Sequence, residues 1–154
     1  MPQAEDIEAC KVAVVGYCTA INDWETAQTI LDRVAKGQHV IGLQREAVEG
    51  ITPESHREKH ADIFRRFVVP RDRSYGSNPG EPNSWGNKGS FFDVAHESIE
   101  SVDLPSHDRA EVVTNWGYQL PGGRTMFVLK RLNGSWLIDS LKVDSTEGWE
   151  DAHL

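Results

Sequence analysis

The alternation of apolar and polar residues near the end of the chain predicts a β-hairpin. Two runs rich in β-branched and aromatic residues flank Asn133-Gly134, a pair that favours a two-residue type I′ turn. Such a turn pairs Leu129 with Ile138 and Phe127 with Ser140. One face then carries Phe127, Leu129, Trp136 and Ile138, and the other Met126, Val128, Leu132, Leu137, Leu141 and Val143. Because both faces are apolar, we expect a central strand pair covered by helices on one side and closed over an interior on the other.

Helical periodicity dominates the first 70 residues. Residues 4–22 show apolar positions at three- and four-residue steps, and Asn22-Asp23 is expected to break this helix and cap a second one that ends near Gly37. Residues 38–51 are ambiguous, with a short strand or turn as the alternatives. The run Thr52-Pro53-Glu54 predicts a helix start, and that helix stops before Pro70.

The second half of the chain predicts strands. A loop over residues 71–90, rich in Gly, Asn, Ser and Pro, separates the helices from strands at 98–104 and 109–120. No domain linker follows. Helices followed by antiparallel strands predict one α+β domain over residues 1–154, with three helices before the sheet.

Composition narrows the class of protein. With 26% charged and 38% apolar residues, the chain is globular rather than disordered. No apolar run approaches the roughly 20 residues needed to cross a membrane, and no secretory leader is evident. The two cysteines, Cys10 and Cys18, are expected to be buried thiols in a reducing compartment, so we expect a cytoplasmic protein.

The net charge of −8 argues against a nucleic-acid partner. Residues 93–111 carry a net −5 and residues 139–151 a net −4, whereas residues 57–73 carry +3. Such an acidic surface is either simply solvated or steers a basic protein partner. The candidate contact residues are Glu97, Glu100, Asp103, Asp108, Glu111, Glu147, Trp149 and Glu150.

Two of the aromatic residues allow opposite interpretations. Trp149 either docks the acidic tail onto the sheet or forms an exposed binding anchor. Trp116 alternates with apolar residues on one strand face, which is more typical of core than of a ligand cavity.

Few residues suggest catalysis or metal binding. His56 and His60 have the i, i+4 spacing that can share a metal, but Arg57 stands where zinc proteases have Glu and no third ligand is evident. An exposed polar helix face is the favoured interpretation, and we expect neither a metal nor a cofactor. Asp139 could act as a general base inside a cone, although pairing with Lys130 is the favoured alternative.

Several segments together resemble the nuclear-transport-factor-2-like fold, and within it the immunity proteins of bacterial polymorphic toxin systems. The resemblance covers roughly residues 60–154. It rests on Glu97-Ser-Ile-Glu-Ser-Val102, Ala110-Glu-Val-Val-Thr114, Phe127-Val-Leu129, Gly134-Ser-Trp-Leu-Ile-Asp139, Gly148-Trp149 and the Tyr75-Gly76 turn. It implies a curved antiparallel sheet that wraps three helices into a cone.

The resemblance implies a non-enzymatic inhibitor that binds and blocks a cognate toxin domain. The alternative is a small cavity-based enzyme of the same fold, an isomerase, dehydratase or hydrolase acting on an apolar small molecule. A dimeric scaffold module is a third possibility, because this fold hosts all three classes.

Overall fold

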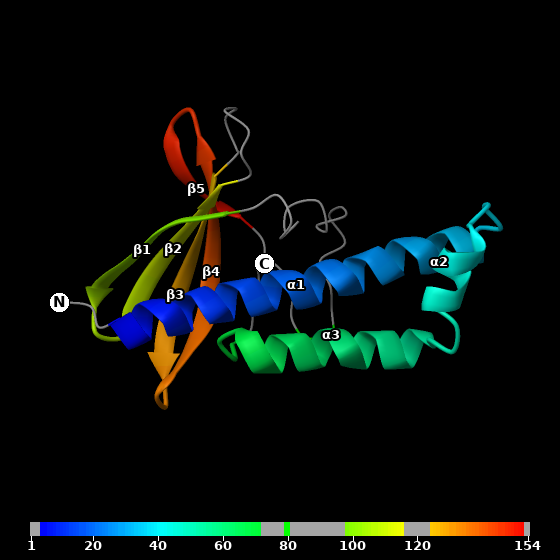
Figure 1. Ribbon diagram of the computed structural model, residues 1–154, viewed down its shortest axis with the longest axis horizontal. Helices are drawn as coiled ribbons and strands as arrows, with labels where there is room; N and C mark the ends of the chain where they lie inside the picture. Colours follow the sequence, from blue (N-terminus) through cyan, green and yellow to red (C-terminus); the bar gives the residue numbers. More distant parts are fainter. Residues whose placement is uncertain (1–3, 72–78, 81–97, 116–123, 153–154) are drawn as a thin grey trace.

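A computed structural model describes residues 4–71, 79–80, 98–115 and 124–152, and it places a helical layer against an antiparallel sheet (Figure 1). The α+β prediction is therefore confirmed. The described strands form an open sheet in which each strand pairs with its neighbour in sequence. The elements are α1 (Ala4–Ala35), α2 (Gly42–Ala47), α3 (Pro53–Phe67), β1 (Ser98–Ser106), β2 (Arg109–Asn115), β3 (Arg124–Leu132), β4 (Ser135–Ser145) and β5 (Gly148–Ala152).

The helix α1 is continuous, and the predicted break at Asn22-Asp23 is wrong. Its buried stripe runs without interruption through Ile21, Trp24 and Ile30. Asn and Asp disfavour a helix interior by only about 0.7 kcal/mol each, whereas burying one large apolar side chain contributes roughly 1.5–3 kcal/mol. Packing of the stripe therefore outweighs the local preference, and the helix ends where predicted, just before Gly37 with its φ of +68°.

The length of α1 divides the molecule into two parts. Its 32 residues span about 48 Å at 1.5 Å per residue. In Figure 1 the first half of α1 crosses the sheet, and the second half continues beyond it beside α2 and α3. The ambiguous segment 38–51 contains the short helix α2 rather than a strand. Val40 and Val48, which flank α2, form a second small core with Ile30 of α1.

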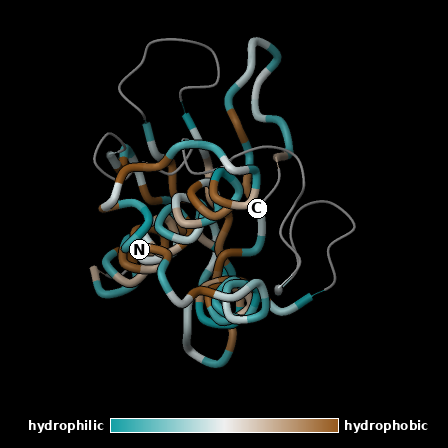
Figure 2. Tube along the Cα trace, turned by 90° about the vertical axis from the view of Figure 1, so that its right-hand side faces the viewer, coloured by the Kyte–Doolittle hydropathy of each residue, from teal (hydrophilic) through white to brown (hydrophobic). Residues whose placement is uncertain are grey.

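The helix α3 begins and ends as predicted. The Thr52 hydroxyl accepts a hydrogen bond from the backbone N–H of Ser55 at 3.0 Å, and the Ser55 hydroxyl accepts one from Thr52 N–H at 3.0 Å. Gly16 of α1 allows α3 to approach closely, because a Cβ at Gly16 would lie 2.7 Å from Cε1 of Phe67. Seen along the long axis in Figure 2, both helices appear end on.

The Asn133-Gly134 turn is confirmed, with φ values of +51° and +81°. Leu129 pairs with Ile138 as predicted, but the predicted pairing of Phe127 with Ser140 is wrong. A bulge at Asp139, opposite the step from Val128 to Leu129, adds one residue to β4, so Phe127 pairs with Leu141.

The bulge moves Leu141 onto the face that packs on the helices. That face buries Phe127, Leu129, Trp136 and Ile138, as predicted, together with Leu141. The other face is less apolar than expected, since Leu132 is exposed.

The two ends of the sheet also depart from the prediction. Strand β1 continues past Pro105 to Ser106, which is possible because β1 is at the end of the strand order and Pro105 need not donate to a neighbour. The tail forms a fifth strand that pairs Trp149 with Asp144 and Glu150 with Val143. The predicted strand 109–120 is described to Asn115; its remainder, with Trp116, and most of the 71–90 loop lie outside the described residues.

Candidate functional site

The acidic residues predicted to bind a partner lie on the sheet, in rows set by strand register. Asn115 of β2 pairs with Arg124 of β3, and Asp144 of β4 pairs with Trp149 of β5. Glu100 lies at a bulge in β1 between Ile99 and Ser101. The next acidic row pairs Asp103 of β1 with Glu111 of β2. We call Glu100, Asp103, Glu111 and Trp149 the acidic sheet surface.

Arg124 links the two ends of this surface. Its Nε donates to Oε2 of Glu100 at 2.9 Å, and its guanidinium carbon lies 5.7 Å from the centre of the Trp149 ring. The Trp149 side chain remains 37% exposed. The backbone of Trp149 therefore docks the tail onto the sheet while its ring is open to solvent, and its role as a binding anchor stays a prediction.

The central pair of this surface consists of two like charges. Asp103 and Glu111 are direct cross-strand partners, an arrangement that is unfavourable for the isolated protein. Glu111 has one counter-ion, Arg109, at 3.4 Å. Within the described ranges, Asp103 is exposed and forms no ion pair.

The remaining predicted residues are more scattered. Asp108 lies at the opposite end of the β1–β2 hairpin, next to Ser106. The Ser106 hydroxyl donates to Asp108 Oδ1 at 2.7 Å and holds the pKa of that carboxyl below its usual value. Glu147 and Glu150 are exposed at the β4–β5 turn and on β5. Glu97 falls outside the described residues.

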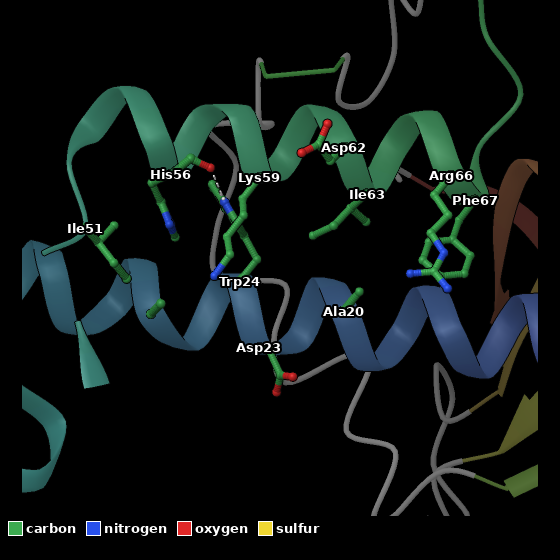
Figure 3. Close-up of a pocket in the computed structure, with 11 residues that line it drawn as sticks. Ala20, Asp23, Trp24, Ile51, His56, Lys59, Asp62, Ile63, Arg66 and Phe67 are labelled. Atoms are coloured by element: carbon green, nitrogen blue, oxygen red, sulfur yellow. Dashed lines mark hydrogen bonds between the residues drawn. The ribbon is translucent and has the colours of Figure 1, made fainter. Parts of the chain in front are cut away.

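A second site, between α1 and α3, was not predicted from the sequence. It is a cavity of about 330 Å³ lined mainly by apolar side chains, with charged residues among them (Figure 3). The lining residues are Ala20, Asp23, Trp24, Ala27, Ile51, His56, Lys59, Asp62, Ile63, Arg66 and Phe67.

The histidines beside this cavity are buried, so their predicted place on an exposed polar face is wrong. His56 is 4% exposed and His60 is 1% exposed. The His56 ring stacks on Trp24 with 4.3 Å between ring centres, and the His60 ring stacks on Phe64 at 4.6 Å. The positions 56, 60 and 64 form one helical stripe, a signal of burial that the sequence contained.

Burial also changes the acid–base behaviour of both rings. Loss of hydration lowers the pKa of His60 to about 4, with the neighbouring His56 contributing in the same direction. Loss of hydration likewise lowers the pKa of His56. His60 Nδ1 accepts from Gly80 N–H at 3.1 Å. In the described part of the chain, neither ring nitrogen of His56 has a hydrogen-bond partner.

Asp139, the general base of the enzyme alternative, is held by two cations. Its Oδ2 lies 3.6 Å from Nζ of Lys130, which confirms the predicted pairing, and its Oδ1 lies 3.0 Å from Nε of Arg71. The contact with Arg71 was not predicted because it joins segments 68 residues apart.

No group of three or more potential metal ligands occurs among the described residues. Cys10 and Cys18 are both buried, as predicted, and burial raises the pKa of Cys10 to about 11. None of the described helices is long and apolar enough to span a membrane. Comparisons with protein-family models, with curated proteins and with solved structures found no match.

Proposed function

We propose that this chain is an immunity protein that binds a basic toxin domain through the acidic sheet surface and blocks it without catalysis. The resemblance of residues 60–154 to such proteins motivates the proposal, and it carries the finer expectation that the sheet curves into a cone. The observation that carries the proposal is the cross-strand pair Asp103–Glu111. A lysine or arginine of the partner would relieve the repulsion between these carboxylates, so binding gains energy that the free protein lacks.

The composition of the surface fits such a contact. An exposed aromatic ring, Trp149, lies among acidic side chains and can serve as an anchor. Arg124 holds Glu100 and Trp149 in place before binding, which reduces the ordering cost of association. The partner would be cytoplasmic, in the same compartment as this chain.

The first test is protection. The gene should neighbour one for a toxin with a C-terminal effector domain, and co-expression with that domain should restore growth of the host cell. A neighbouring toxin that kills equally well with and without this chain would contradict the proposal.

The second test locates the contact by association kinetics with the same toxin domain. The triple variant Glu100→Lys, Asp103→Lys and Glu111→Lys should slow association by at least tenfold at low salt, and the difference should shrink above physiological ionic strength. The matched control reverses three exposed acids that lie outside the sheet, Glu8, Glu46 and Glu49, with the same change in net charge. Equal slowing in both variants would show that net charge alone acts, and would refute a contact on the sheet.

A further inference from the structure

The cavity between α1 and α3 is separate from the acidic sheet surface, and its shape suits a small molecule. Its volume of about 330 Å³ lies at the low end of the range of roughly 300–1,000 Å³ for ligand sites. Figure 3 shows Ala20 and Trp24 of α1 on one side and Ile63 and Phe67 of α3 on the other. The lining is mainly apolar and includes the aromatic rings of Trp24 and Phe67, which favour an aromatic ligand.

One polar group of the lining lacks partners. His56 is 96% buried, counted from its 4% exposure, and in the described part of the chain both its ring nitrogens are without hydrogen bonds. A neutral imidazole has one donor and one acceptor, and leaving a buried polar group unsatisfied costs about 1–3 kcal/mol. The Trp24 indole does not supply the partner, since it donates to the backbone oxygen of His56 at 2.7 Å. Burial lowers the pKa of His56, so the ring is neutral and adds no charge to the lining.

The charges of the lining favour an anion. Lys59 and Arg66 extend from α3 toward α1 in Figure 3. Neither forms an ion pair within the described ranges, whereas Asp62 is already paired with Arg65. Asp23 is the remaining acid of the lining. Counting ion pairs among the described residues alone, the cavity therefore presents two cations without a counter-ion and one such anion.

We propose that this cavity binds a small aromatic carboxylate. The ring lies between Trp24 and the apolar side chains of α3, and the carboxylate pairs with Lys59 and Arg66. The site does not depend on the proposed toxin contact, since its residues belong to α1, α3 and the turn before α3.

The test is calorimetric titration of the full chain with 1-naphthoate, and with naphthalene-1-carboxamide as the uncharged control. We expect saturable 1:1 binding of the carboxylate and at least tenfold weaker binding of the amide. Lys59→Gln and Arg66→Gln should each weaken binding about fivefold, the equivalent of one exposed ion pair. The matched control Arg57→Gln removes an exposed cation of α3 that does not line the cavity, and should leave binding unchanged.

Two variants that fill the cavity complete the test. Ile63→Trp from α3, or Ala20→Leu from α1 if the first does not fold, should abolish binding while leaving the helical circular dichroism intact. Absence of saturable binding at millimolar 1-naphthoate would overturn the proposal. Equal affinity for carboxylate and amide, or binding that survives the folded filled variant, would overturn it as well.

Discussion

The helix pair and the sheet place their polar side chains in opposite ways. Between α1 and α3, two histidines are buried against aromatic rings, in the neutral form that burial favours. On the sheet, carboxylates stay at the surface and even face one another across β1 and β2. The stability of the helix pair should therefore depend mainly on pH, whereas the interactions between charges on the sheet should depend mainly on ionic strength. The following experiments test that division.

The largest difference is expected between two tryptophans. Trp24 is 7% exposed and packs on His56, whereas Trp149 is 37% exposed. Trp24→Ala should lower the free energy of unfolding by about 3–5 kcal/mol, and Trp149→Ala by less than about 1 kcal/mol. Urea denaturation measures both. The control Trp24→Phe keeps an aromatic ring, although a smaller one, and loses the hydrogen bond to His56 O. Loss of that bond should cost about 1 kcal/mol in addition to the cost of the smaller ring. Equal losses for the two alanine variants would contradict the division.

The next effect is the response of the helix pair to acid. The pKa of His60 is about 4 in the folded protein, below its ordinary value of 6.5. The unfolded chain therefore takes up the proton first, and stability falls as the pH drops from 6.5 toward 4, by on the order of 3 kcal/mol. His56, whose pKa is also lowered, adds to this loss.

The measurement is the unfolding free energy as a function of pH in His60→Gln, which can still accept from Gly80 N–H. The difference in unfolding free energy between wild type and His60→Gln should change by on the order of 3 kcal/mol between pH 6.5 and pH 4. The exposed His107 provides the control, and His107→Gln should follow the wild type. A constant difference for His60→Gln would show that this ring is not the titrating group.

The close approach of the two helices gives a third test. Gly16→Ala raises helix propensity by about 1 kcal/mol, yet its Cβ would meet Cε1 of Phe67 at 2.7 Å. We expect a net loss of about 1–2 kcal/mol by thermal unfolding. In a Phe67→Leu background the same substitution should be neutral or stabilising. If Gly16→Ala alone stabilises the protein, the Phe67 ring moves aside without loss of packing energy.

The smallest effect tests the sheet charges. Asp103→Asn should stabilise the protein by about 0.2–1 kcal/mol because it relieves the repulsion from Glu111, and the gain should fade at high salt. Asp151→Asn is the contrast, since Asp151 lies opposite Lys142, and it should be neutral or slightly destabilising. A gain for Asp103→Asn that is independent of salt would have another cause.

Features set by neighbouring residues were predictable from the sequence. The Asn133-Gly134 turn and the Thr52 cap each depend on a few adjacent positions, and both occur as expected. The bulge in β4 was not predictable, because it depends on how β4 packs against α1 and α3. That one residue moved Leu141 to the helix-packed face.

The same limit applies to the candidate sites. Exposure of the acidic side chains followed from composition, but the juxtaposition of Asp103 with Glu111, and of Arg124 with Trp149, required the register. Burial of His56 and His60 required α1 to stay helical past Asn22, so that Trp24 faces α3. The low helix propensity of Asn22 and Asp23 led to the prediction of a helix break, and the arrangement was therefore missed.

The segment directly after α3 has a consequence for assembly. Among the described residues, strand β5 pairs with β4 at residues 141–145, which leaves the earlier part of that edge to another partner. Val68 forms a parallel bridge with Ile138, Val69 N–H donates to Ile138 O at 2.8 Å, and Arg71 donates to Asp139 O at 3.0 Å. Open strand edges template aggregation by adding strands from other molecules. By occupying these carbonyl groups, and by placing a proline at position 70, the turn that ends α3 protects this edge of the sheet against fibril-like growth.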